Sequence, residues 1–214
     1  MIPILTDVER DIVDELERYD SLLMFHEVRT CFMGAIACPT DGINPMRVIT
    51  SIWGGELPTF MDVKDADQFF DIFINQLWDP FAEQQMAKKP FELTKWRYKA
   101  TKKDLAALAE IRTDEIAVFI DAIEGPDDEN VKLPRRAVQA VRVLGEVYGL
   151  LSAIELLALD KSIPKPKSEI AELLIQMEKM TAIAELEINE AIIACNKKRT
   201  NLSRKKQKNT GLLH

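Results

Sequence analysis

A run of basic residues near the C-terminus is the part of the sequence best suited to binding chemistry. Residues 197–208 contain no acid and seven basic side chains: Lys197, Lys198, Arg199, Arg204, Lys205, Lys206 and Lys208. Clustered positive charge binds a phosphate backbone with an affinity that falls steeply as the salt concentration rises. The same composition is also typical of a solvated tail, or of one lying on an acidic surface of its own chain. We expect a disordered basic tail over 197–214, with contact to an acidic partner and simple solubilisation as the two alternatives.

A second basic stretch surrounds two aromatic residues. Trp96 and Tyr98 are interleaved with Lys95, Arg97, Lys99, Lys102 and Lys103. Aromatic rings between positive charges can stack on single-stranded bases. We favour the plainer interpretation, in which the two rings anchor a connecting segment to the protein.

The cysteines and histidines offer little for catalysis or metal binding. His26 and Cys31 are five residues apart, and no Asn or Asp is evident to orient the histidine as a nucleophile's base requires. Cys31 and Cys38 supply too few ligands for zinc, and the Glu-x-x-His pairs of a di-iron bundle are absent. The sequence contains neither GxxxxGK[ST] nor GxGxxG, so no phosphate loop is recognisable. We expect no catalytic residue, no metal and no cofactor; an enzyme using Cys31 or acidic residues in a pocket stays a weaker alternative.

Composition and charge describe an ordinary globular protein. The 214 residues carry a net charge of -7, and outside 197–208 the other 21 of the 28 bases stand against 35 acids. The longest nearly apolar run, 150–159, is interrupted by Glu155 and is far shorter than the ~20 residues of a membrane-spanning helix. The first residues do not resemble a signal peptide, and three cysteines are an odd number. These features predict a cytoplasmic location and no membrane partner.

Apolar residues recur at steps of three and four, and only 8 glycines occur, which predicts an all-α fold. We expect a bundle of about six to seven helices in one or two packed groups, over about 7–27, 30–38, 45–53, 63–87, 102–123, 134–159 and from 168 onward. Pro80 should break or kink the fourth of these, and residues 88–103 should form a partly ordered connection. Val138 and Tyr148 are expected on the inward side of the helix over 134–159. The glycine- and proline-containing loop at 125–130 divides an N-terminal region, 1–125, from a helical hairpin, 131–196.

The last helix has a nearly heptad seam of apolar and small residues. Its members alternate at steps of four and three: Ile170, Leu174, Met177, Thr181, Ala184, Ile188, Ala191 and Cys195. We expect this seam to pack against the preceding helix, with pairing between subunits of a homo-oligomer as the alternative.

The stretch from Phe32 to Pro39, the Asn44-Pro45 turn and the sequence Trp53-Gly54-Gly55-Glu56 resemble the N-terminal signature of the YecA and YgfB-like family of bacterial helical proteins. The matching positions are Gly34, Ala35, Pro39, Pro45 and Trp53, within residues 28–83. The resemblance implies a small-residue helix followed by a proline turn and a second helix that ends near a tryptophan. It departs from the family at Thr30-Cys31, and residues beyond 88 do not match. The cysteine-rich metal-binding module that closes some family members has no counterpart among the C-terminal residues.

Taken together, these features predict a non-catalytic interaction or adaptor protein similar to the YecA and YgfB-like family, with a protein or ribonucleoprotein partner. The first alternative is a nucleic-acid-associated regulator that uses the basic C-terminal residues.

Overall fold

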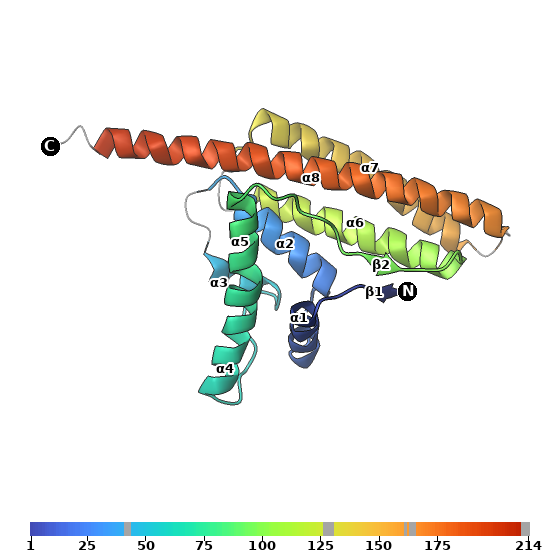
Figure 1. Cartoon of the computed structure of the whole chain (residues 1–214), viewed down its shortest axis with the longest axis horizontal. Coiled ribbons are helices and arrows are strands. Elements are labelled where there is room, and N and C mark those ends of the chain that lie inside the picture. Colours follow the sequence, from blue (N-terminus) through green and yellow to red (C-terminus); the bar gives the residue numbers. More distant parts are fainter. Residues whose placement is uncertain (41–43, 126–130, 161, 163–165, 211–214) are drawn as a thin grey trace.

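The computed structural model of the chain describes residues 1–40, 44–125, 131–160, 162 and 166–210, and the side chains as far as Leu202 (Figure 1). Its elements are β1 (Ile2–Pro3), α1 (Asp7–Arg18), α2 (Phe25–Ala37), α3 (Pro45–Ser51), α4 (Val63–Phe70), the π-helix η1 (Asp71–Trp78), α5 (Asp79–Met86), β2 (Trp96–Arg97), α6 (Lys102–Glu124), α7 (Arg135–Leu159) and α8 (Lys167–Thr210). β1 and β2 pair antiparallel, and within the described residues no other strand occurs. The expected all-α multi-helical bundle is confirmed.

Three long helices, α6, α7 and α8, run along the length of the molecule (Figure 1). α7 packs against both α6 and α8, and α6 also packs against α2. The predicted seam of α8 is buried along its length except at Thr181, which is only half-buried. The expectation that this seam packs within the chain is therefore confirmed.

The inward side of α7 differs from the prediction. Val138 and Tyr148 are exposed, and Ala137 and Ala140 are buried in their place, together with Leu144 and others. The prediction assigned the larger apolar residues to the buried side of the helix. In the structure α7 packs through small side chains, which allow the helix axes to come close together.

α2 crosses α6 at a point of close backbone approach. A Cβ atom on Gly34 would lie 2.9 Å from the carbonyl oxygen of Phe119 and 2.9 Å from the Cβ of Ala122. Only glycine fits here, and this explains the small-residue helix in terms of packing. α6 therefore links α2 to α7, and one hydrophobic cluster continues from α1 through α8.

The single helix expected over 7–27 is wrong, because a turn separates α1 from α2. Asp20 takes a positive φ of 49°, and the Ser21 hydroxyl donates to the carbonyl of Leu23 while accepting from the Leu23 N–H. The carboxylate of Glu27 then accepts the N–H of Met24 and caps the first turn of α2. Local side-chain hydrogen bonds of this kind compete with the helical ladder and end it.

The helix expected over 63–87 is present as α4, η1 and α5 in succession, without a break at Pro80. Pro80 follows the wider π-helical turn, and the Asp79 N–H bonds the Ile74 carbonyl five residues back. A wider turn relieves the clash between a proline ring and the preceding turn, which explains the continuity. The buried face of these helices is rich in aromatic rings, and the Phe69 and Phe73 ring centroids are 4.7 Å apart.

Candidate nucleic-acid interface

Helix α8 is the longest element, and hydrogen bonds fix it to the body of the protein. The Asn189 side chain accepts the Phe91 N–H at 2.7 Å and donates to the Phe91 carbonyl at 2.9 Å. On another side of the helix, Arg136 of α7 pairs with Glu187 at 2.6 Å and with Glu190 at 3.2 Å. Glu187 and Glu190 of α8 thus form ion pairs within the chain. The basic residues of the helix are concentrated in its C-terminal part, over 197–208.

Arg199 is a structural residue. One guanidinium nitrogen donates to the carbonyl of Ile36 at 2.5 Å, and the other donates to the Asn196 side chain at 2.7 Å. The Ile36 carbonyl belongs to the last turn of α2, where a cation also interacts favourably with the helix dipole. Burial lowers the pKa of Arg199 below its ordinary value, with nearby thiols acting in the opposite direction. Arg199 therefore holds α8 against the end of α2.

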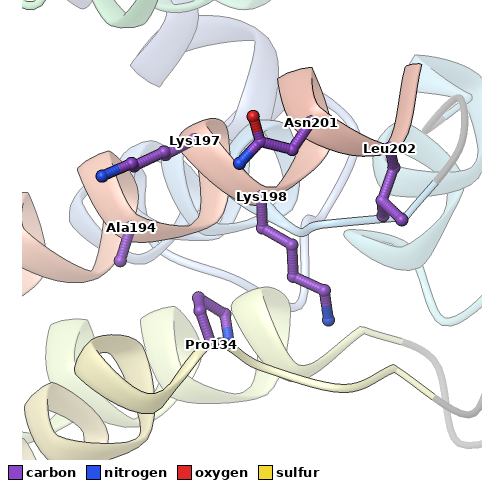
Figure 2. Close-up of a pocket in the computed structure, with 6 residues that line it drawn as sticks. All are labelled: Pro134, Ala194, Lys197, Lys198, Asn201 and Leu202. Carbon is purple, nitrogen blue, oxygen red and sulfur yellow. The ribbon is translucent and has the colours of Figure 1, made fainter. Parts of the chain in front are cut away.

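Lys198 is also engaged with the body, whereas Lys197 is exposed. The Lys198 ammonium donates to the backbone carbonyl of Lys132, just before α7. Figure 2 shows Lys198 extending from α8 toward the start of α7, beside a shallow pocket of about 340 Å³. Most of the surface that lines the pocket consists of apolar atoms, including those of the lysine side chains. The lining residues are Pro134, Ala194, Lys197, Lys198, Asn201 and Leu202. Among the described side chains, neither lysine makes an ion pair with a carboxylate.

Beyond this point α8 continues past the rest of the protein. The helical backbone reaches Thr210, and Figure 1 shows its C-terminal part extending beyond the other helices. Residues 197–210 correspond to about 21 Å of helix at 1.5 Å per residue. The expected disordered tail is thus replaced by helix as far as Thr210. Good helix formers such as Lys and Arg, added to a helix already packed in its first part, extend it at little cost.

The seven basic residues of the prediction therefore fall into three groups. Lys198 and Arg199 bond backbone carbonyls of the body, and Lys197 is exposed. Arg204, Lys205, Lys206 and Lys208 follow on the helical backbone, and their side chains lie outside the described part. We call residues 197–208 the basic end of α8.

The second basic stretch supports the anchor interpretation. The Tyr98 hydroxyl donates to Glu178 of α8 at 2.5 Å, and burial together with this bond raises the pKa of Tyr98 to about 12. Trp96 packs edge-to-face on His26, with ring centroids 5.9 Å apart. Both aromatic rings contact other elements of the chain, as expected of anchors for the extended segment between α5 and α6.

The side chains of His26 and Cys31 line two different cavities. His26 lines one of about 510 Å³ with Trp96, and Cys31 lines another of about 690 Å³ between α2, α3 and α6. Burial raises the pKa of the Cys31 thiol to about 12. Burial, assisted by Arg112, lowers the pKa of His26 to about 4. At neutral pH both groups are therefore uncharged, which does not favour a thiolate nucleophile.

Two features were not predicted from the sequence. The first is the presence of Arg47 and Asp121 in the lining of the cavity beside Cys31. The second is a buried ion pair between Arg112 and Glu115, in which Glu115 also accepts the Thr94 N–H at 3.1 Å. Arg and Glu three residues apart are usual on exposed helices, so the sequence carries no signal of their burial.

The remaining matching positions of the family resemblance have structural roles. Pro45 occupies the first turn of α3, whose N-cap Asn44 accepts the Met46 N–H at 2.9 Å. The Trp53 indole donates to the Tyr19 carbonyl at 2.8 Å. Ala35 and Pro39 are buried. These contacts account for the residue types without any ligand.

Comparisons of the chain with family models, with curated proteins and with solved structures find no match. Within the described residues, no group of three His, Cys, Asp or Glu side chains could hold a metal ion. No helix there is both long enough and apolar enough to span a bilayer. The family resemblance stays a prediction.

Proposed function

We propose that the protein is a non-catalytic interaction protein whose basic end of α8 binds the phosphate backbone of a nucleic acid, either alone or within a ribonucleoprotein. The observation that carries the proposal is the continuation of α8 beyond the other helices, with seven bases and no acid over residues 197–208. Lys198 and Arg199 bind the body, whereas the backbone that carries the remaining bases continues beyond a body with an excess of acidic residues.

The sequence of the basic end suits a phosphate backbone. Positions 197, 204 and 208 recur along one side of the helix, with 205 on its edge and 206 opposite, because a helix turns by 100° per residue. Such a row of basic positions fits a phosphate backbone that runs along the helix. It supplies affinity without base readout, so the expected binding tolerates sequence and depends on salt.

A non-catalytic role is supported by the state of the thiols and by the separation of His26 from Cys31. A catalytic thiol needs a depressed pKa and access to solvent, whereas the pKa values of Cys31 and Cys195 are both raised to about 12 by burial. Titration of the native protein with a disulfide reagent at pH 7 should therefore be slow at all three buried cysteines. Rapid modification of Cys31 would favour an enzyme using the adjacent cavity.

The expected cytoplasmic location and the YecA and YgfB-like relationship belong to the same proposal. Three cysteines in positions buried within a helical core suit a reducing compartment. An adaptor role, as that resemblance implies, would use the helical body for a protein partner and the basic end for the nucleic acid.

Affinity capture from cell lysate tests the proposal. A chain ending at Leu202 keeps the contacts of Lys198 and Arg199 and removes four basic residues, so it separates binding from folding. The full chain should retain nucleic acid and its proteins, and nuclease treatment or truncation should release them. A specific protein retained equally by both chains after nuclease treatment would place the interaction on the body instead.

A further inference from the structure

Helix α8 carries a second apolar stripe on the side opposite its buried seam. Four large side chains are exposed there: Ile175 at 50%, Ile183 at 44%, Leu186 at 58% and Ile193 at 55%. With Lys179 and Ala182, which are also exposed, these residues recur at steps of three, four and seven, which is the spacing of a helix–helix seam. Single exposed apolar residues are ordinary on a protein surface, but several on one side of a helix indicate an interaction surface.

The charges beside this stripe change sign along the helix. Residues 167–196 contain six acids and two bases, whereas 197–208 contain seven bases. Glu172 lies exposed before the stripe, and Lys197 lies exposed after it. A parallel pairing of two such helices would place like charges together, whereas an antiparallel pairing places acidic residues against basic ones.

We propose that a second copy of the chain docks on this stripe, with the two α8 helices antiparallel about a twofold axis near residue 184. The sequence is self-complementary in that register. Ile175 faces Ile193 of the second copy, and Leu186 faces the small side chain of Ala182 of the second copy, because the residue numbers of facing positions have a constant sum. Glu172 and Lys197 of the second copy are one residue out of this register, as are Lys179 and Glu190 of the second copy, so each pair is near enough to interact across the interface. Every contact occurs twice, as a closed twofold interface requires.

The proposed interface is compatible with the contacts already made by α8. The buried seam faces α6 and α7, the segment around Phe91 contacts Asn189, and Arg136 contacts Glu187 and Glu190 on the α7 side. Around the helix axis, the stripe lies between the Phe91 contact on one side and the Arg136 contacts on the other. Together with the flanking charges it extends over about 38 Å, from Glu172 to Lys197, at 1.5 Å per residue. The inference goes beyond the proposed nucleic-acid binding and does not depend on it.

Sedimentation equilibrium of the full chain tests the inference. The wild type should show a monomer–dimer equilibrium, and Leu186→Glu should raise the dimer Kd at least about tenfold, because two charges would be buried beside the axis. Leu22→Glu is the matched control, since Leu22 is 70% exposed on the turn between α1 and α2. Circular dichroism confirms that both variants fold. A monomeric wild type at all concentrations, or equal effects of the two substitutions, would overturn the proposal.

The orientation is tested by charge reversal and by cross-linking. Glu172→Lys should raise the dimer Kd several-fold, and the double variant Glu172→Lys/Lys197→Glu should restore it. A mixture of Ile175→Cys and Ile193→Cys chains should form a disulfide-linked dimer under mild oxidation, whereas neither variant alone should do so efficiently. Efficient cross-linking of either single variant with itself would instead show a parallel pairing and contradict the antiparallel register.

Discussion

At the scale of single residues, His26 shows how burial fixes the state of a titratable group. Its side chain is buried in the first turn of α2, its Nε2 atom has no hydrogen-bond partner among the described residues, and its ring packs against Trp96. Desolvation, with a smaller contribution from Arg112, lowers its pKa to about 4 from an ordinary 6.5. The residue therefore acts as a neutral core ring rather than as a base.

This shift predicts a pH dependence of stability. Between pH 6.5 and 4 the unfolded chain takes up a proton at His26 that the folded chain refuses, so stability is lost as the pH falls. Because the pKa of His26 differs by about 2.5 between the unfolded and the folded chain, the largest possible loss of unfolding free energy is about 3 kcal/mol. Relative to His26→Phe, the wild type should therefore lose roughly 2–3 kcal/mol of unfolding free energy between pH 7 and 4. Urea denaturation at both pH values measures the difference, and equal losses in the two proteins would show that His26 is not desolvated.

Gly34 gives a second prediction at this scale. Alanine at an exposed helical glycine usually stabilises by about 0.5–1 kcal/mol, but at Gly34 its Cβ would lie 2.9 Å from the Phe119 carbonyl. Gly34→Ala should therefore lower the unfolding free energy by about 1–3 kcal/mol. Gly145→Ala on α7 is the matched control, because its Cβ would meet nothing within 4 Å, and it should be stabilising. Stabilisation by both substitutions would show that α2 and α6 do not approach closely.

At the scale of elements, Arg199 couples the end of α8 to the end of α2. Arg199→Met removes its bond to the Ile36 carbonyl and the charge at the α2 terminus, so it should cost about 1–2 kcal/mol of unfolding free energy. Lys197→Met, at an exposed position two residues earlier, should change stability by less than about 0.5 kcal/mol. Chemical denaturation compares the two. A neutral Arg199→Met would mean that this end of α8 is held by its apolar seam alone.

The elements also show what the sequence can and cannot predict. The seam of α8, the Asn44 cap of α3 and the helix after Pro134 follow local rules of periodicity and capping, and each is present. The break after Arg18 depends on competing side-chain hydrogen bonds around Ser21, which periodicity does not reveal. The structural use of Lys198 and Arg199 depends on carbonyls far away in the chain. Charge clustering identified these residues, but only the tertiary structure separates anchors from the exposed Lys197.

At the scale of the whole molecule, one core joins the two regions expected on either side of residue 125. α6 packs against α2 and against α7, so unfolding of the C-terminal helices should remove cover from the N-terminal region. Ile188→Ala, at a fully buried seam position, should cost about 2–5 kcal/mol. The three tryptophans lie in the N-terminal region, at positions 53, 78 and 96, whereas the helical circular dichroism signal is dominated by α6–α8. Ile188→Ala should therefore lower the unfolding midpoint by the same amount whether it is followed by tryptophan fluorescence or by circular dichroism. A lower midpoint in circular dichroism alone would indicate two separate folding units.

The whole molecule is also electrically polarised, with an acidic body and a basic end, and this organisation underlies the proposed function. Two variants each lose four positive charges, one from the basic end of α8 and the other from the rest of the chain, and both keep Lys198 and Arg199. The test variant carries Lys197→Gln, Lys205→Gln, Lys206→Gln and Lys208→Gln. The control variant carries Lys64→Gln, Lys88→Gln, Lys89→Gln and Lys167→Gln, all at exposed positions. Both variants have the same net charge, so a difference between them reports position rather than total charge.

The most direct measurement is the fluorescence anisotropy of a labelled single-stranded RNA titrated with each protein at salt concentrations from 50 to 200 mM. The wild type and the control variant should bind with similar affinity and a similar salt slope. The test variant should bind at least about tenfold more weakly at 50 mM, with a slope smaller by about 3, since each lost phosphate contact removes roughly 0.7 from it. Equal binding by the test and control variants, or no binding by the wild type at 50 mM salt, would contradict a nucleic-acid interface at the basic end of α8.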